Sequence, residues 1–253
     1  MLATKEHGDV RAGQVPLLIA HGLYGSARNW GVIAKRLSDS RPVIAVDMRN
    51  HGASPWVDSH SYFDLAADLA EVIEAHGGRA DVLGHSMGGK AAMVLACTQP
   101  DRVNRLIVAD IAPVAYEHSQ IQFADAMRGL DLAGVTTRTE ADARLAQTVE
   151  DKGIRAFLLQ SLDVPAGRWR LNLDVLTRDM AGIVGFVPLA GSFEGPTLFL
   201  SGAASDYVLP EHRPEIKRLF PKARFVKIPH AGHWLHAEKP REFEAAVRVF
   251  LDA

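Results

Sequence analysis

Residues 84–88 read Gly-His-Ser-Met-Gly and match the pattern Gly-x-Ser-x-Gly, with the apolar run Ala80–Leu83 before them and a helix-like stretch, Gly89–Thr98, after them. A serine hydroxyl is a poor nucleophile at neutral pH unless the protein holds it beside a base. A tight turn between a strand and a helix exposes the serine and points helix N-terminal amides at charge that develops on a substrate. The stretch therefore predicts a nucleophilic serine, Ser86, on such a turn.

The same stretch also fits a phosphate-binding loop, because Gly84–Lys90 matches Gly-x-x-x-x-Gly-Lys. The run Arg105–Asp110 resembles the strand that ends in a magnesium-binding aspartate in nucleotide hydrolases. However, Ala91 stands where the magnesium-binding Ser or Thr of that loop belongs. Two apolar strand candidates also precede the loop, whereas a phosphate loop more often follows the first strand of its domain. We therefore favour the serine nucleophile.

The composition is that of a globular chain without a polyanionic partner. Its 253 residues suffice for one α/β domain with an insertion and a substantial core. The 28 basic and 30 acidic residues nearly balance, and no basic run stands out. This balance argues against nucleic acid or an anionic membrane as an obligatory partner.

Three sequence features predict a cytoplasmic protein. No apolar stretch approaches the roughly 18 residues that span a bilayer. Residues 1–11 are polar and lack the apolar core of a secretion signal. The single cysteine, Cys97, cannot form an internal disulfide. The sequence leaves the oligomeric state open.

Short apolar runs bounded by Gly, Pro or Asp recur along the chain and predict strands buried on both faces of a parallel sheet. Amphipathic stretches lie between them: Tyr62–His76, with Ser61 as N-cap and Gly77 as stop, and a C-terminal helix that starts at Pro240. Strands that alternate with helices predict a doubly wound, mostly parallel α/β sheet. The predicted strands are Val15–Ala20, Pro42–Val46, Ala80–Leu83, Leu106–Ala109, Thr197–Leu200 and Arg224–Ile228.

One region interrupts this alternation: residues 114–193 show helical periodicity and no convincing strand. Open α/β sheets bind ligands outside the carboxyl ends of their strands. We therefore expect residues 114–193 to form a helical cap over that edge, inserted in a core of residues 1–113 and 194–253. The alternative is a connector that only completes the core. The candidate helices are Ala141–Glu150, opened by a capping box at Thr137, then Ile154–Leu162 and Trp169–Ile183.

A serine nucleophile needs a base, and among the 11 histidines His233 has the most informative position. It lies in the run Pro229–Pro240, after the last predicted strand and before the last helix, where a loop reaches the carboxyl edge of the sheet. Its neighbours His230 and His236 are the competitors. We expect His230, close to the strand end, to be structural and His236 to begin the turn into the final helix.

Several motifs, in this order, resemble the α/β-hydrolase superfamily: His21-Gly22, Asp47-Met-Arg-Asn-His-Gly-Ala-Ser54, Gly84-His-Ser-Met-Gly-Gly89 and Gly232-His-Trp-Leu-His-Ala-Glu-Lys-Pro240. With Asp110-Ile-Ala-Pro-Val114, they look most similar to the small bacterial carboxylesterases of the YbfF type. The resemblance covers nearly the whole chain and implies the α/β-hydrolase fold with a helical cap. Only about twenty residues precede His21. We therefore expect the antiparallel edge that often starts this sheet to be trimmed.

The resemblance implies Ser86 as nucleophile, His233 as base and an oxyanion hole made by the backbone N–H groups of Leu23 and Met87. Lys90 would then be an ordinary residue of the helix after the serine. This chemistry needs no cofactor. The sequence contains neither Gly-x-Gly-x-x-Gly nor a His, Cys and Asp cluster with metal-ligand spacing, so we expect no metal.

The acid that orients the histidine has two candidates. In most of the superfamily it follows the strand after the insertion, which points to Asp206, whereas the most similar relatives point to Asp110 after the preceding strand. Asp110 ends an apolar run and should be buried, which suits a carboxylate that holds an imidazole. Asp206 lies in a loop rich in Ser, Ala and Gly, where an exposed turn residue is common. We favour Asp110.

The remaining polar residues are first expected to be structural. His21 should position the oxyanion loop by hydrogen bonding, and Asp47 and Arg49 should brace the loop after their strand. Cys97 should be a small buried apolar residue.

The predicted reaction is hydrolysis of a short- to medium-chain acyl ester or thioester, a small-molecule substrate, through an acyl-enzyme. Two alternatives use the same triad, namely a carbon–carbon bond hydrolase and a perhydrolase; a third is a ligand receptor on this fold. The expected acyl pocket contains Phe157, Leu158, Leu162 and Trp169. The other expected substrate contacts are His21, Gly22, His85 and Trp234.

Overall fold

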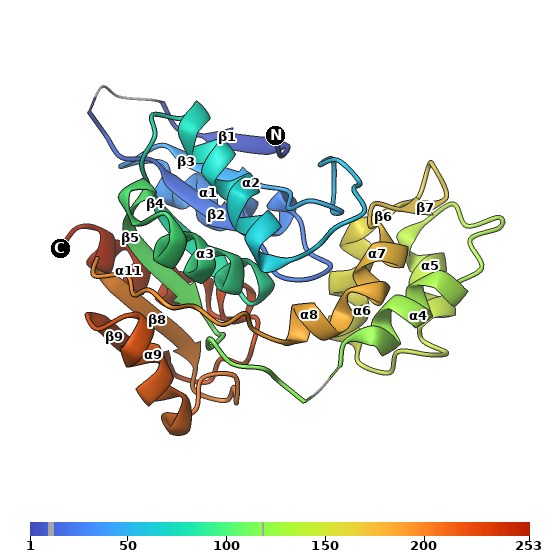
Figure 1. The fold of residues 1–253 in the computed structure, drawn as a ribbon. Coiled ribbons are helices and arrows are strands. Elements are labelled where there is room, and N and C mark those ends of the chain that lie inside the picture. Colours follow the sequence, from blue (N-terminus) through green and yellow to red (C-terminus); the bar gives the residue numbers. More distant parts are fainter. Residues whose placement is uncertain (10–12, 118) are drawn as a thin grey trace.

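The computed structural model describes residues 1–9, 13–117 and 119–253; Val10 and Arg11 of the polar N-terminal stretch lie outside these ranges. Its centre is a seven-stranded sheet with the order β1-β3-β2-β4-β5-β8-β9 (Figure 1). Each of the six predicted strands overlaps one strand of this sheet, which confirms the α/β architecture. The strands are β1 (Thr4–His7), β2 (Leu17–Ala20), β3 (Val43–Val46), β4 (Ala80–His85), β5 (Val103–Ala109), β8 (Thr197–Gly202) and β9 (Ala223–Ile228).

Strand β1 was not predicted, and it shows that the residues before His21 supply one antiparallel strand at this edge. It pairs antiparallel with β3, while β3, β2, β4, β5, β8 and β9 run parallel to one another. Its residues Thr4-Lys-Glu-His7 are exposed or half-buried at the border of the sheet. An edge strand of this kind needs no apolar run, so hydrophobic periodicity could not reveal it.

Helices cover both faces of the sheet, as in a doubly wound fold (Figure 1). Successive residues of β2 point to opposite faces: Leu18 belongs to the core cluster that includes residues of α2, α3 and α9, and Leu17 to the cluster that includes residues of α1 and α11. The α-helices of this part are α1 (Gly31–Leu37), α2 (Tyr62–Ala75), α3 (Met87–Thr98), α9 (Arg213–Leu219), α10 (Leu235–Glu238) and α11 (Pro240–Leu251). Short 3-10 turns are η1 (Ala27–Trp30), η2 (Pro100–Arg102), η3 (Leu159–Ser161) and η4 (Pro210–His212).

Two predicted helix boundaries are confirmed by their local chemistry. Helix α2 begins after Ser61, whose hydroxyl accepts a hydrogen bond from the Asp64 backbone N–H at 3.2 Å. The chain leaves that helix through Gly77, which has a φ of +103°. Helix α11 starts at Pro240, where the missing N–H is tolerated.

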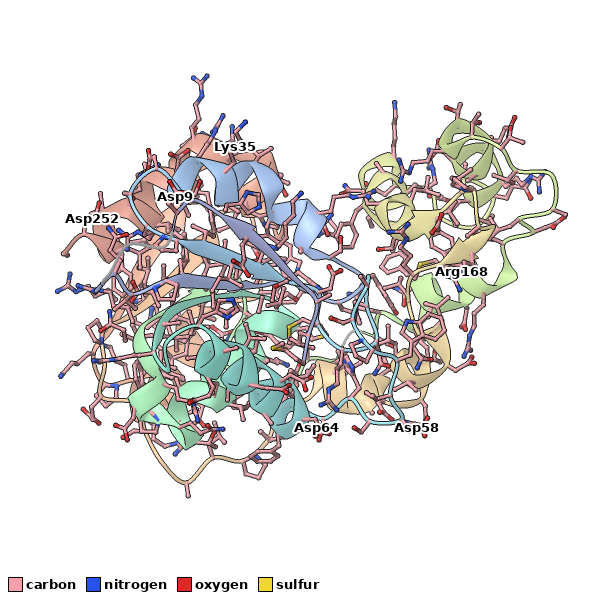
Figure 2. All side chains as sticks on the ribbon, turned by 90° about the horizontal axis from the view of Figure 1, so that it is seen from above. Asp9, Lys35, Asp58, Asp64, Arg168 and Asp252 are labelled. Carbon is pink, nitrogen blue, oxygen red and sulfur yellow. The ribbon has the colours of Figure 1, made fainter. Side chains whose placement is uncertain are left out.

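The segment between β5 and β8 is mainly helical and lies beside the carboxyl end of the sheet (Figure 1). In Figure 2 its Arg168 is set apart from the body that carries Lys35 and Asp252. The Thr137 capping box is present, because its side chain accepts from the Glu140 N–H at 3.2 Å. The helices are α4 (Ile121–Gly129), α5 (Arg138–Leu145), α6 (Lys152–Leu158), α7 (Leu173–Arg178) and α8 (Met180–Val184).

Two details of this segment differ from expectation. Helix α5 ends at Leu145 rather than continuing to Glu150. Trp169 lies in a two-residue strand, β7 (Arg168–Trp169), that pairs with β6 (Leu162–Asp163), and not in a helix. Strands this short carry no periodic signal.

We propose that residues 114–193 act as the cap domain.

No helix among the residues described is both long enough and apolar enough to cross a bilayer.

Replacing Ser61 by Ala removes the acceptor for the Asp64 N–H and should lower the free energy of unfolding by about 1 kcal/mol. Urea denaturation followed by far-ultraviolet circular dichroism measures the change. Ser61→Thr keeps a hydroxyl acceptor and is the matched control. Equal stability of the Ala and Thr variants would mean that this cap does not stabilise α2.

Candidate active site

Ser86 occupies the sharp turn between β4 and α3. Its backbone has φ +52° and ψ −119°, a strained conformation for a residue with a side chain. The turn is held from both sides: the Ser86 N–H donates to the Ala109 carbonyl of β5, and the Ser86 carbonyl accepts from the Lys90 N–H, each at 3.0 Å. The hydroxyl is therefore presented at the carboxyl end of β4, in the position that the motif predicts.

The glycines of the motif are required because backbone packs on backbone at this turn. A Cβ on Gly84 would lie 2.3 Å from the Gly88 carbonyl oxygen, and a Cβ on Gly88 would lie 2.4 Å from the Ala20 carbonyl oxygen. Neither oxygen can move without disrupting β2 or α3. Close packing thus explains the glycine spacing around Ser86.

Asp110 and His233 meet at the carboxyl edge of the sheet. The His233 Nδ1–H donates to Asp110 Oδ2 at 2.8 Å, and the carboxylate is fully buried. Two further donors hold the carboxylate: the Gly202 N–H at 3.0 Å from Oδ1 and the Ser205 hydroxyl at 2.5 Å from Oδ2. Because Nδ1 donates to the carboxylate, the neutral ring keeps Nε2 as its basic nitrogen.

Of the two candidate acids, Asp110 is the one that the structure brings to His233. Asp206 is exposed, in the loop after β8. The next residue, Tyr207, stacks on the His233 ring with centroids 3.9 Å apart. Sequence reasoning considered this loop only for Asp206 and missed Ser205, because a serine in a small-residue loop gives no signal of its partner.

The two competing histidines lie near His233 but hold no carboxylate among the described contacts. His230 is exposed on the turn after β9, with φ +57°. His236 is buried in α10 and stacks on Trp30 at 4.1 Å, and burial, aided by the charge of His233, lowers its pKa to about 3. His236 is therefore a neutral packing residue at neutral pH.

His85 has a role that the sequence did not indicate. Its Nε2–H donates to the His233 backbone carbonyl at 2.9 Å, so the residue before Ser86 holds the loop that carries His233. Burial, and then the neighbouring His233, lower the pKa of His85 well below its usual value. The ring is thus a neutral donor at neutral pH.

A cavity of about 380 Å³ lies between the core and the inserted segment, a size in the range of small-ligand sites. Ser86, His233, Leu23 and Met87 all line it. Met87 is the first residue of α3, where a backbone N–H has no acceptor within the helix. The inserted segment contributes an apolar wall of Phe123, Ile154, Phe157, Leu158 and Ile183.

The expected substrate contacts divide into two groups. His21, Gly22, His85 and Trp234 line the cavity, as do Phe157 and Leu158. Trp169 and Leu162 do not. Trp169 is buried, and its indole Nε1–H donates to the Met127 carbonyl at 2.7 Å, so it joins β7 to α4 inside the inserted segment. This corrects the expectation that Trp169 contacts the substrate.

Lys90 is not the ordinary helix residue that was expected. It lies one turn after Ser86 and is almost fully buried, and its ammonium donates to the carbonyls of Val184 at 2.9 Å and Gly185 at 2.5 Å. These carbonyls are at the end of α8, where a cation is favoured by the helix dipole. Its Nζ also lies 4.8 Å from the Tyr116 ring centroid. Burial lowers the pKa of Lys90 to about 7. Lys90 therefore ties α3 to the segment that returns from the inserted helices.

The loops around the cavity are braced as expected. His21 hydrogen-bonds to Met48 and Gly22. The Asp47 carboxylate accepts from the Ala27 and Ala53 N–H groups at 2.7 and 2.8 Å. No group of three or more His, Cys, Asp and Glu within residues 1–9, 13–117 and 119–253 is arranged to hold a metal ion.

Comparison with known proteins gives consistent matches over almost the whole chain. Residues 15–240 match the family model described as the alpha/beta hydrolase fold. The sn-1-specific diacylglycerol lipase ABHD11 of Mus musculus is 43% identical over 246 residues, covering 93% of this chain and 80% of that protein. Esterase YbfF of Escherichia coli (strain K12) is 39% identical over 241 residues, covering 94% and 93%. A solved structure named marine microorganism esterase has a TM-score of 0.92 at 38% identity and covers 98% of both chains.

The buried Lys90 ammonium predicts a specific pH dependence of stability. Its pKa is about 7 when folded and near 10.5 when exposed, so between these values the unfolded chain binds more protons. The cost of burying Lys90 should therefore decline as the pH rises from 7 to 10. Urea denaturation should show wild type gaining stability relative to Lys90→Met over this range.

The exposed Lys222→Met variant is the control, because its side chain meets water in both states and should give a flat difference. A flat difference for Lys90→Met as well would contradict the lowered pKa.

Proposed function

The chain belongs to the α/β-hydrolase family, and from this premise we propose that it is a serine carboxylesterase acting on short- to medium-chain acyl esters. The observation that carries the proposal is the hydrogen bond from His233 to buried Asp110, beside the cavity that Ser86 and His233 line. The esterase and lipase names of its relatives support ester hydrolysis.

In the proposed acylation step, His233 Nε2 takes the proton of the Ser86 hydroxyl as its oxygen attacks the ester carbonyl. The carbonyl oxygen becomes an oxyanion, which the N–H groups of Leu23 and Met87 stabilise. His233 then gives the proton to the leaving alcohol, and the acyl group stays on Ser86. Asp110 remains ionised and stabilises the imidazolium that forms between these transfers.

Deacylation follows the same path with water as nucleophile. His233 takes a proton from water as the water oxygen attacks the acyl carbonyl. The tetrahedral intermediate then collapses, the acid is released, and His233 returns the proton to the Ser86 oxygen. All proton transfers use one imidazole nitrogen. The proposed two-step reaction therefore needs no cofactor.

The proposed chain-length preference rests on the cavity. Phe123, Ile154, Phe157 and Leu158 give it an apolar wall suited to an aliphatic acyl group. Its volume of about 380 Å³ favours short and medium chains over long ones. A thioester carbonyl would meet the same groups, so thioesters belong to the proposed substrate class.

We also propose that the enzyme acts in the cytoplasm on small molecules, without nucleic acid or an obligatory membrane partner. The balanced charge and the single cysteine of the sequence support this proposal. Among the described residues, no contact favours the carbon–carbon hydrolase, perhydrolase or receptor alternatives.

The proposal predicts turnover of a p-nitrophenyl ester series from acetate to laurate, with a maximum at short or medium chains. Ser86→Ala should reduce kcat to the background rate, because it removes the nucleophile. Release of p-nitrophenol measures both. An inactive wild type, or a fully active Ser86→Ala variant, would refute the proposal and favour the alternatives. A steady rise in activity toward laurate would refute the pocket size alone.

Asp110→Asn should lower kcat by about 10⁴-fold, because the amide no longer holds the imidazole in the required tautomer. The matched variant Asp206→Asn makes the same chemical change in an exposed loop and should leave kcat within about twofold. Steady-state kinetics with p-nitrophenyl butyrate compare them. The reverse ranking would assign the acid to Asp206.

A further inference from the structure

Two neighbouring loops exchange hydrogen bonds through a pair of histidines. Residues 21–25 follow β2 and include Leu23, and residues 47–52 follow β3. His21 Nε2, on the first loop, accepts from the Met48 N–H of the second at 2.9 Å. His51 Nε2, on the second loop, accepts from the Tyr24 N–H of the first at 3.1 Å. Each loop therefore supplies one imidazole acceptor and one backbone donor to the other.

The same contacts determine the protonation of both rings. His21 Nδ1 lies 2.8 Å from the Gly22 carbonyl, and His51 Nδ1 lies 2.8 Å from the Arg49 carbonyl. A carbonyl can only accept, so each Nδ1 carries the hydrogen and each Nε2 has a free lone pair. A doubly protonated ring could not accept at Nε2. Both hydrogen bonds between the loops thus require neutral histidines.

Burial keeps these rings neutral. His21 and His51 are almost completely buried, and their ring centroids are 5.0 Å apart. Burial is the main cause that lowers the pKa of His21 to about 4 and of His51 to about 3. The next buried ring, His60, lies 5.7 Å from His51, and a charge on it would also lower the pKa of His21.

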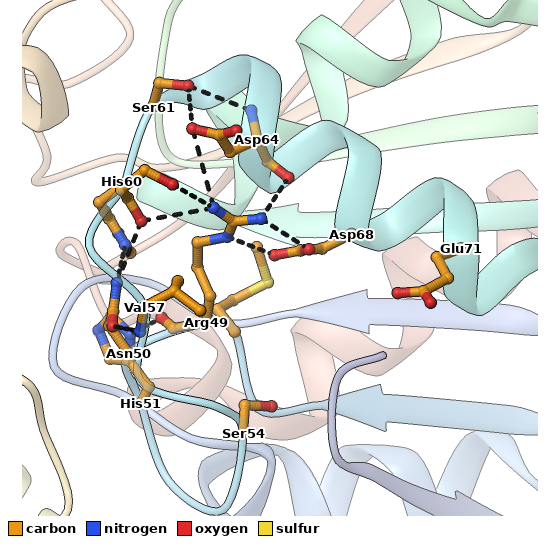
Figure 3. A network of polar contacts seen from close by, with 12 residues as sticks. Arg49, Asn50, His51, Ser54, Val57, His60, Ser61, Asp64, Asp68 and Glu71 are labelled. Atoms are coloured by element: carbon orange, nitrogen blue, oxygen red, sulfur yellow. Dashed lines mark hydrogen bonds and ion pairs between the residues drawn. The ribbon is translucent and has the colours of Figure 1, made fainter.

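The second loop is itself rigidly attached to the core (Figure 3). The Arg49 guanidinium forms a bidentate salt bridge with the Asp68 carboxylate of α2, with N···O distances of 2.6 and 2.8 Å. The Asn50 side-chain amide donates to the Ser59 carbonyl at 3.2 Å. Loop 47–52 is therefore a firm support against which the first loop can be positioned.

The first loop needs such support. Tyr24 has φ +62°, a conformation that costs energy for a residue with a side chain. Leu23 lies between Gly22, whose carbonyl binds His21, and Tyr24, whose N–H binds His51. The backbone is thus held on both sides of the proposed oxyanion donor.

We propose that His21 and His51 form a reciprocal imidazole clasp that positions the Leu23 N–H for the oxyanion. This inference rests on the proposed function, since it assigns the clasp to that oxyanion hole. His51 is a positioning residue and acts through the Tyr24 N–H. The sequence motif suggested this role for His21, whereas the part played by His51 and the exchange between the loops come from the structure.

The first test compares His51→Leu with His51→Gln. Leucine removes the acceptor for the Tyr24 N–H, whereas the glutamine side-chain oxygen can take the place of Nε2. His51→Leu should lower kcat for p-nitrophenyl butyrate by about 10²-fold with KM within about twofold, because misplacing a donor weakens transition-state binding. His51→Gln should retain most of kcat.

A core variant controls for lost stability. Val247→Ala shortens a buried side chain of α11, in the core cluster of the other sheet face. It should lower the thermal midpoint without lowering kcat in folded protein. The clasp is overturned if folded His51→Leu keeps wild-type kcat, or if His51→Gln loses as much kcat as His51→Leu.

The second test does not depend on activity. Long-range ¹H–¹⁵N spectra of the full chain should show His21 and His51 as neutral Nδ1–H tautomers at pH 7 and still neutral at pH 5. An Nε2–H tautomer, or protonation of either ring in folded protein at pH 5, would overturn the clasp. If wild type hydrolysed no ester, the proposed function would fail, and the tautomers alone would decide whether the clasp exists.

Discussion

The strained turn at Ser86 is the constraint on which the rest of the site depends. A left-handed backbone at a residue with a side chain persists only where its surroundings hold it. Here the contact of Gly84 and Gly88 with neighbouring backbone and the hydrogen bond to β5 hold it. Because β4 lies between β2 and β5, the same edge also receives Leu23 from one neighbour and Asp110 from the other. The parallel sheet therefore brings Ser86, Leu23 and Asp110 to one edge.

Burial shapes the chemistry of the residues around this turn. Among the described residues, five histidines, His21, His51, His60, His85 and His236, are buried and have lowered pKa values. They are neutral at neutral pH and so add no positive charge around the turn, and His21, His51 and His85 also hold loops by hydrogen bonds. Asp110 is buried as well, but three donors hold its carboxylate. The surroundings of the Ser86 turn thus combine a hydrogen-bonded carboxylate with neutral imidazoles.

Much of the fold could be predicted because its signals are local. Apolar runs identified six strands, and Ser61 and Pro240 marked the starts of α2 and α11. The prediction failed where no apolar period exists, at the polar edge strand β1 and at the two-residue strands β6 and β7. Trp169 was misplaced for a related reason. The sequence pattern does not reveal whether an aromatic side chain faces the cavity or packs inside the inserted segment, as Trp169 does.

The sequence by itself determined the alternation of strands and helices, the turn at Ser86 and the short list of groups able to act there. These depend on neighbouring residues, since glycine spacing, caps and periodicity are read along the chain. Only the tertiary structure decided between Asp110 and Asp206, because the His233 partner lies 123 residues away. It alone also decided the burial of Lys90 and the exchange between His21 and His51. Charge state and hydrogen-bond partner depend on what packing removes from water, and no local pattern encodes that.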